Sequence, residues 1–526
     1  MLQLWKRYRK KAILGIIFIF LSSATMIGME FIKARLIDSA VAKDLNSLVY
    51  AAVFLCIMVI IKAYTHYLYS LKFFGFRVDC GSDLRKFIFD SILHRSYPDF
   101  LKRKSGEYLS IYTNQVSDVE NSYFNSYYGL FQILTEFIMS MIFLSLINPW
   151  LSLSSFLSLI PALLIPLLVM KLMSNAKQEY VDSLNINLAK LKEWLVGFET
   201  IISFNRTNTF LKLFDKSIDD VKIKAEKTGV LNALFMNISS ILVKLSGLVV
   251  IVMAALQVAR GKISIGLFVA AVGIMDQLTT QIVHISNYFK ELIVVRVPIN
   301  SIFSLIDEKS SDDSKNIAIK NVHSIDFKDM SFRHNDSDKY LFENFDLHIK
   351  KHGIYEIMGE SGSGKSTLMS ILFGYFEPTK GEIRLNDISV TDISNLTEIV
   401  TVMRQEAIFF DDSLRNNLTM YREISDDIII DLMKSLGLSK YANRDSLDRE
   451  LVNANEMFSG GEARRFMLIR SLLKDSEILI LDEPLANVDI KSLQKIENLI
   501  QNIKDKYVFV ITHKPLDKKD KSIYIK

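Results

Sequence analysis

The sequence has little cysteine and little net charge. Among 526 residues only two are cysteines, Cys56 and Cys80. On one continuous helix they would lie about 36 Å apart, so they cannot pair and a disulfide framework is excluded. The net charge of +4 is small for this length and gives no reason to expect a nucleic-acid partner.

The N-terminal segment also lacks the small-residue cleavage site of a signal peptide, although basic residues precede its first apolar stretch. Further apolar stretches follow it, so we expect a retained first membrane helix. No peptidase domain precedes that helix, and we therefore expect no leader-cleaving role.

Long apolar runs are present, but they are confined to residues 12–300. Apolar residues make up 49% of the chain and the mean hydropathy is +0.21, high for a soluble protein and low for one that lies wholly in a membrane. Residues 307–526 read instead as a soluble α/β sequence. The chain is long enough for two or more domains, and its two halves differ in kind.

Six stretches in the first half are each close to the ~20 residues that cross a bilayer. They lie at 13–29, 51–70, 127–147, 151–170, 232–258 and 264–288. Lys and Arg concentrate in the N-terminal tail and in the 71–126 and 171–230 connections, which is typical of cytoplasmic segments. An even number of spans then leaves both termini in the cytosol.

The two basic connections predict helices that continue far beyond the membrane. Proline is absent from Ala51 to Tyr97, and an unbroken helix of about 45 residues would be nearly 70 Å long. We expect turns near Pro98 and near Arg206–Thr209, with short helices at Tyr97–Arg103 and Arg206–Phe210 that rest on the second half. The alternative is a pair of ordinary soluble loops.

The strongest motif is a glycine-rich loop between a strand-like run and a helix-like run. Backbone N–H groups of such a loop curl around phosphates, and the helix N-terminus adds partial positive charge. Lys365 would reach the β- and γ-phosphates, and the Ser366 hydroxyl would bind Mg²⁺. The loop comprises Gly359, Glu360, Ser361, Gly362, Ser363, Gly364, Lys365, Ser366 and Thr367.

Three further positions fit nucleotide hydrolysis. Asp482 and Glu483 end a buried strand, where Asp482 can hold the Mg²⁺ shell and Glu483 can polarise the attacking water. His513 ends another apolar strand and Gln405 follows a third. Alone, each of these is as well explained by a structural role.

Between them, Ser459, Gly460, Gly461 and Glu462 open an Arg- and Leu-rich helix. This arrangement is a second anion-binding nest. One ATP does not need two such nests on one chain, which indicates that they serve different ATP molecules in a dimer.

Taken together, these motifs resemble those of ATP-binding cassette exporters, in particular bacterial peptide and multidrug half-transporters with the membrane domain first. The resemblance covers essentially the whole chain. It implies that Gly359–Thr367 is the Walker A loop, Gln405 the Q-loop and a further Mg²⁺ contact, and Ser459–Glu462 the signature. Asp482 and Glu483 end Walker B, Asp489 lies in the D-loop, and His513 is the switch histidine.

Some positions depart from the family pattern. His334 stands where a tyrosine usually stacks on adenine, which implies a lower nucleotide affinity. The signature begins with Phe458 instead of Leu and ends with Glu462 instead of Gln. These departures remove no catalytic group.

The resemblance implies a multidomain membrane protein. We expect a six-helix all-α transmembrane domain with long cytosolic extensions at 1–305, a linker at 306–320, and an α/β P-loop nucleotide-binding domain at 321–526. The implied cofactors are ATP and Mg²⁺. The implied partners are lipid, the transported substrate and a second half-transporter, with a homodimer favoured over a heterodimer, in the cytoplasmic membrane with the nucleotide-binding domain in the cytosol.

Polar residues inside the spans are candidates for contact with substrate, because burying charge in lipid is costly. Some of them could instead snorkel or pair structurally. Glu136 and Lys244 lie too centrally to snorkel easily, and we expect them to face a wet cavity or each other. The candidates are Lys62, Glu136, Lys244, Asp276 and His284, with His66, Gln277 and Gln281 nearby in sequence.

We therefore expect ATP-driven export, by alternating access, of a peptide or an amphiphilic small molecule. The alternatives are a flippase for a lipid-linked substrate and an ATP-gated or regulatory membrane protein with vestigial hydrolysis. An importer is disfavoured because its cassette usually sits on a separate chain.

Overall fold

The structure is a computed structural model that describes residues 2–307, 317–333, 339–360, 362–486, 490–512, 515–516 and 519–525. Side chains at 2–3, 161–170, 279–280, 282–283, 286, 290 and 490–492 lie outside the described set. The chain forms two compact units. The first comprises residues 1–93 and 104–308, and the second comprises residues 94–103 and 309–526.

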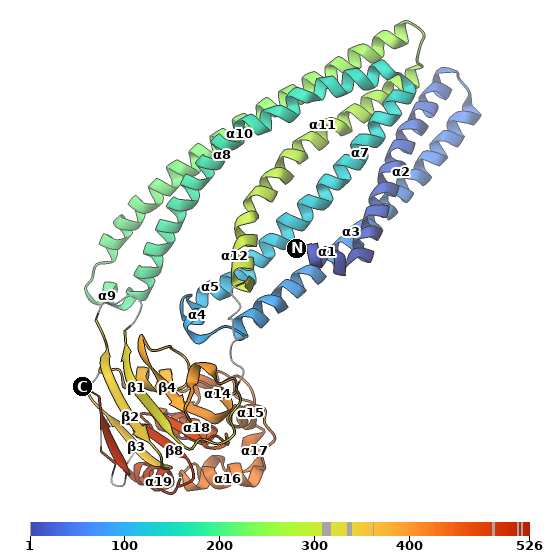
Figure 1. Cartoon of the computed structure of the whole chain (residues 1–526). Helices are drawn as coiled ribbons and strands as arrows, with labels where there is room; N and C mark the ends of the chain where they lie inside the picture. Colours follow the sequence, from blue (N-terminus) through green and yellow to red (C-terminus); the bar gives the residue numbers. More distant parts are fainter. Residues whose placement is uncertain are drawn as a thin grey trace. The chain divides into compact units, whose positions relative to one another are not determined.

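The first unit is a bundle of long helices (Figure 1). Four of its described helical stretches are long and apolar enough to cross a membrane: α2 (Arg9–Val41), α3 (Leu45–Leu93), the run Ser105–Ile147 and α10 (Thr207–Ala259). The other two expected spans lie in α8 (Pro149–Val196) and α11 (Ile265–Val294). The short helices α1 (Leu2–Arg7) and α12 (Arg296–Asp307) flank the bundle in sequence.

The run Ser105–Ile147 is one helical path with two π-helical segments. It consists of α5 (Ser105–Ser110), η1 (Ile111–Gln115), α6 (Val116–Asp118), η2 (Val119–Phe124) and α7 (Asn125–Ile147). In the bundle α2 runs along α3, α8 runs along α10, and α11 packs against α2, α7 and α10. Asp38 on α2 fixes the start of α11 by accepting hydrogen bonds from Ser264 Oγ at 2.6 Å and Gly266 N at 2.7 Å.

The predicted helical extensions are confirmed at the first connection. Helix α3 is unbroken over 49 residues, and the chain then turns into the short helix α4 (Tyr97–Leu101), which Ser96 caps. At the second connection the short helix does not lie at the predicted position, Arg206–Phe210. The short helix is α9 (Phe198–Ser203), and residues 207–210 already belong to α10. Gly197 ends α8 and separates it from α9.

The second unit holds two sheets (Figure 1). An antiparallel sheet has the order β2-β1-β4-β5, from β2 (Phe342–Ile349), β1 (Ile325–Phe332), β4 (Lys380–Leu385) and β5 (Ile388–Ser389). A parallel sheet has the order β6-β7-β8-β3-β9, from β6 (Val400–Met403), β7 (Ile478–Asp482), β8 (Tyr507–Ile511), β3 (Gly353–Met358) and β9 (Lys521–Tyr524). Strands β7 and β8 are buried throughout, as expected for a parallel sheet that is covered on both faces.

Helices surround these sheets and complete the core. They are α13 (Lys365–Leu372), α14 (Leu396–Ile399), α15 (Leu414–Thr419), α16 (Asp426–Ser435), α17 (Arg444–Leu447), α18 (Gly460–Leu472) and α19 (Ile490–Gln501), with the 3₁₀ turns η4 (Val390–Asp392), η5 (Ser439–Tyr441) and η6 (Ala454–Glu456). The parallel-sheet strands contribute buried side chains to two hydrophobic clusters.

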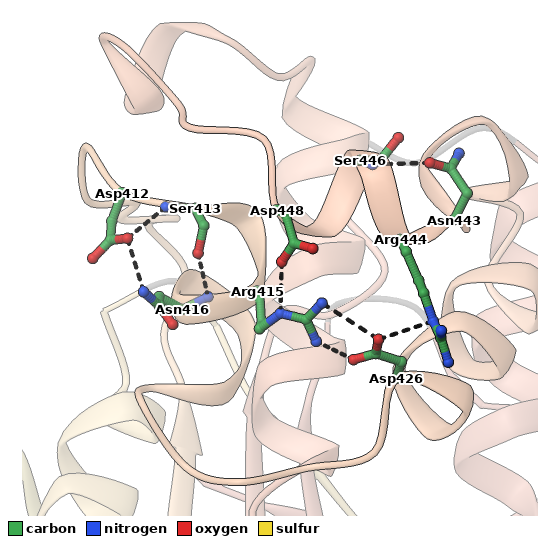
Figure 2. A network of polar contacts seen from close by, with 9 residues as sticks. All are labelled: Asp412, Ser413, Arg415, Asn416, Asp426, Asn443, Arg444, Ser446 and Asp448. Atoms are coloured by element: carbon green, nitrogen blue, oxygen red, sulfur yellow. Dashed lines mark hydrogen bonds and ion pairs between the residues drawn. The ribbon is translucent and has the colours of Figure 1, made fainter.

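An ion-pair network joins α15, α16 and α17 (Figure 2). The guanidinium of Arg415 bonds Asp448 Oδ1 at 2.9 Å and also bonds both carboxylate oxygens of Asp426. Arg444 reaches Asp426 at 3.2 Å. The Arg415 hydrogen bonds hold the pKa of Asp426 below its usual value. These bonds fix the helices that lie between Gln405 and the Ser459 nest in sequence.

A fully buried carboxylate, Glu356 on β3, ties the C-terminal segment to the parallel sheet. It accepts hydrogen bonds from Leu516 N at 2.6 Å and Ser522 Oγ at 2.9 Å and pairs with Lys519 Nζ at 2.5 Å. Burial alone would raise the pKa of Glu356, but these bonds outweigh burial and leave its pKa below the usual value. The carboxylate is therefore held in its ionised form.

We predict that Glu356→Gln destabilises the second unit by about 1–3 kcal/mol at neutral pH, because Lys519 loses its charged partner. The lowered pKa means that the carboxylate stabilises above the unfolded value of about 4.3, and this contribution disappears as pH falls through the folded pKa. Thermal unfolding between pH 4 and 8 measures both effects. The exposed Glu343→Gln on β2 is the control, and equal unfolding midpoints for the two variants would contradict the prediction.

Candidate nucleotide site and membrane polar residues

The glycine-rich loop follows β3 and leads into α13, as the sequence predicts. Gly364 precedes the helix with φ of +90°, a left-handed conformation that a side chain would disfavour. Lys365 Nζ donates to the carbonyl oxygens of Gly359 at 2.9 Å and Glu360 at 2.7 Å. Within the described residues the Ser363 hydroxyl is buried without a hydrogen-bond partner. The two hydrogen bonds from Lys365 hold its ammonium group beside the loop, where it can bind phosphate.

Two carboxylates stand at the end of β7. Asp482 is 8% exposed, and burial raises its pKa, opposed by a hydrogen bond from the Ser366 hydroxyl. Glu483 has φ of +50°, which is uncommon for a residue with a side chain. Gln405 Nε2 donates to Glu483 Oε2 at 3.1 Å. Ser366 and Gln405, from two distant parts of the chain, therefore meet the carboxylate pair at the end of β7.

These groups line a hollow of about 390 Å³. A cationic lysine and loop N–H groups on one side can bind a polyphosphate. Carboxylates on the other side can hold a divalent cation and take a proton from water. The hollow is lined by Leu341, Gly362, Gly364, Lys365, Ser366, Thr367, Gln405, Asp482, Glu483 and Ile511.

The second nest begins α18. Ser459 caps the helix, and Glu462 returns its carboxylate to the Ser459 N–H at 3.1 Å, which completes a capping box. Burial alone would raise the pKa of Glu462, but hydrogen bonds from Lys440 and Ser459 bring it below the usual value. Glutamate and glutamine serve equally at this capping position, so the departure at Glu462 preserves the local structure.

Phe458, the other departure, is buried in an aromatic cluster. Its ring lies 5.1 Å from that of Phe409, 4.8 Å from that of Phe466 and 5.7 Å from that of Tyr441. The larger side chain is therefore accommodated by neighbouring rings. Four of the predicted site residues, His334, Ser361, Asp489 and His513, lie outside the described residues.

The short helix α4 belongs to the second unit, where its Tyr97 contacts Arg404, the residue before Gln405. The ring of Tyr97 stacks on that of Tyr375 at 4.1 Å. The Arg404 guanidinium lies 5.5 Å from the Tyr97 ring centre and 4.9 Å from that of Tyr375. A residue from the first basic connection is thus in contact with the neighbour of the Q-loop residue.

In the membrane unit, Glu136 on α7 is linked to α11. It accepts hydrogen bonds from Gln132 Nε2 at 2.9 Å and from Gln281 Nε2. Lys244, Asp276 and His284 are exposed on the single chain. Of the predicted polar residues, Gln281 is therefore hydrogen-bonded to Glu136, while Lys62 on α3 is partly buried and Lys244 is exposed.

One buried membrane carboxylate, Glu30, was not among the predicted polar residues. Glu30 on α2 is 3% exposed, pairs with Lys33 Nζ at 2.7 Å and accepts from Gln277 Nε2 at 3.4 Å. A polar residue inside an apolar helix, the signal used for Glu136, would have found it. Among the described residues, the side-chain oxygens of Gln277 and Gln281 are both buried without a hydrogen-bond partner.

Both halves of the chain match known protein families. Residues 12–282 match the ABC transporter transmembrane region, and residues 342–486 match the ABC transporter family. An export ATP-binding/permease protein of Rickettsia typhi is 23% identical over 518 residues, covering 96% of this chain and 90% of the relative. An ATP-dependent lipid A-core flippase of Mannheimia succiniciproducens is 24% identical over 521 residues, covering 96% and 88%.

A solved structure, described as a bacterial Atm1-family ABC exporter with ATP bound, has a TM-score of 0.85 at 17% identity and covers 98% of this chain and 93% of its own. That likeness confirms the predicted fold class of a helical membrane domain joined to an α/β nucleotide-binding domain. The two family matches confirm the resemblance drawn from the motifs. The chain is a member of the ABC transporter family, with the membrane domain and the ATPase domain of an exporter on one polypeptide.

Proposed function

We propose that this protein exports a peptide or an amphiphilic small molecule across the cytoplasmic membrane, with its nucleotide-binding domain, residues 321–526, in the cytosol. The observation that carries the proposal is the hollow in which the glycine-rich loop, Gln405, Asp482 and Glu483 meet. ATP binding there closes two nucleotide-binding domains, and hydrolysis lets them open, so that the membrane halves alternate their access.

The side chains that line the hollow have distinct roles in ATP binding and hydrolysis. Lys365 neutralises the β- and γ-phosphates. Ser366, Asp482 and Gln405 would supply the oxygen ligands that Mg²⁺ prefers, and the bound cation would neutralise phosphate charge. Glu483 accepts the proton of the attacking water. His513 would contact the transferred phosphoryl group, and His334 would stack on adenine.

The working unit is a dimer of two identical chains, in which the Ser459 nest of one chain covers the ATP of the other. Ser459 and Gly460 are exposed on the single chain. A side chain at Gly460 would meet nothing of its own chain within 4 Å, so that face is free to approach a ligand held elsewhere. Glu483 is intact, which favours the homodimer over an unlike pair with one degraded site.

The substrate contacts the polar residues of the membrane unit. The amide nitrogens of Gln277 and Gln281 donate hydrogen bonds to Glu30 and Glu136. The amide oxygens of the same two glutamines are buried and accept no hydrogen bond from the described residues. Acceptors without donors suit a ligand that carries N–H groups or positive charge. A peptide amine or a cationic amphiphile therefore fits better than a purely apolar lipid. The similarity to lipid A-core flippases keeps a lipid-linked substrate as the second candidate.

Stimulation of ATPase activity in lipid vesicles tests this proposal. We predict that cationic amphiphiles raise the ATPase rate several-fold and that Glu136→Gln abolishes the stimulation but keeps the basal rate. The exposed Glu179→Gln on α8 is the matched control and keeps both. Equal stimulation of the wild type and the Glu136 variant would rule out this site. A basal rate indistinguishable from background would favour the ATP-gated alternative.

A further inference from the structure

The sequence motifs assign no role to Arg464. Its side chain nevertheless bonds three backbone carbonyls around the nucleotide site. It stands in the second turn of α18 and is 9% exposed. Its Nη1 atom donates to the carbonyl oxygen of Glu483 at 2.8 Å and to that of Ala486 at 3.1 Å. Its Nη2 atom donates to the carbonyl oxygen of Gln405 at 3.0 Å.

These three carbonyls belong to separate parts of the site. Gln405 follows β6, Glu483 follows β7, and Ala486 leads toward the D-loop. A guanidinium presents five N–H donors in one rigid plane, so a single Arg464 side chain can hold all three segments in fixed register. A lysine carries one flexible ammonium group in place of that plane.

Of these three residues, Glu483 has the least favourable backbone conformation. Its φ of +50° costs free energy for a residue with a side chain and persists only where the surroundings determine it. The Glu483 N–H donates to Ile511 O at 2.9 Å, and its carbonyl accepts from Arg464. Backbone bonds on both sides of Cα therefore fix the direction in which the carboxylate leaves the chain.

We propose that Arg464 is a positioning residue for ATP hydrolysis. By holding the carbonyls of Glu483 and Gln405, it keeps the Glu483 carboxylate and the Gln405 amide, which donates to it, aimed into the hollow. Because Arg464 lies on the helix that begins with the Ser459 nest, it also joins that nest to the backbone of the chain's own Glu483. The proposal rests on the proposed role of Glu483 as the group that activates water.

The test compares Arg464→Met with Arg470→Met in the full-length protein. Arg470 is a matched control because it lies on the same helix and its guanidinium also bonds backbone carbonyls, those of Asn417 and Ile408, which lie outside the hollow. We expect Arg464→Met to lower kcat about 10–100-fold, the cost of misplacing a reacting group by about 1 Å, with KM for ATP changed less than about threefold. Arg470→Met should lose comparable thermal stability with kcat retained.

Arg464→Lys should recover part of kcat, because one of the carbonyls regains a charged donor. It also serves as the test if the methionine variant does not fold. The proposal is overturned if kcat of the folded Arg464 variant stays within about twofold of wild type, or if Arg470→Met lowers kcat equally. If instead Glu483→Gln itself turns over ATP normally, the proposed role of Glu483 fails and the premise falls with it.

Discussion

Replacing Glu483 by glutamine should abolish ATP turnover while leaving ATP binding intact. The amide keeps the size of the side chain and a hydrogen bond to Gln405, but it cannot accept a proton from water. Loss of a general base lowers kcat by about 10²–10⁴-fold. Steady-state hydrolysis measures the loss, and binding of a fluorescent ATP analogue measures the retained affinity.

The exposed acid Glu406, which follows Gln405 in sequence, offers a control. Glu406→Gln should hydrolyse ATP close to the wild-type rate. If Glu483→Gln keeps wild-type hydrolysis, another residue must orient the water, and the assignment of Glu483 is wrong.

Lys365→Ala should weaken ATP binding itself. The ammonium group lines the hollow beside the glycine-rich loop, and charge-assisted hydrogen bonds to phosphate are worth about 1.5–3 kcal/mol. That corresponds to an affinity loss of about 10–100-fold. The same substitution removes the donor to the Gly359 and Glu360 carbonyls, so the loop also loses two hydrogen bonds that stabilise its conformation.

Equilibrium binding of ATP to the two purified proteins measures this loss. The exposed Lys350→Ala, on the segment before β3, is the control and should bind ATP normally. An unchanged Kd for Lys365→Ala would show that the loop does not hold the phosphates.

Much of the molecule could be predicted from the sequence because the signals are local. Twenty apolar residues in a row, a glycine-rich loop between an apolar strand and a helix, and a carboxylate pair after an apolar run each occupy one contiguous stretch. The missing prolines before Tyr97 correctly predicted the length of α3. At the second connection the turn at residues 204–206 lies close to the predicted position. The short helix was placed too late, because Gly197 lies in a polar helical stretch with no proline to mark its end.

What escaped prediction depends on contacts between distant residues. Arg464 resembles its neighbours Arg465 and Arg470 in sequence, and its partners are 19 to 59 residues away. The stacking of Tyr97 on Tyr375 and the bond from Gln281 to Glu136 join segments far apart in the chain. Hydrophobic periodicity or a motif within one contiguous stretch cannot indicate which of several arginines or glutamines will contact such distant partners.

In the proposed dimer, each ATP lies between the glycine-rich loop of one chain and the Ser459 nest of the other. Ser363→Cys and Ser459→Cys, introduced together into a Glu483→Gln protein from which Cys56 and Cys80 have been removed, test it most directly. With ATP bound, oxidation should crosslink two chains of the purified protein, and without nucleotide the yield should fall. A purified protein that never forms the crosslink with ATP would contradict the symmetric dimer and point to an unlike partner chain.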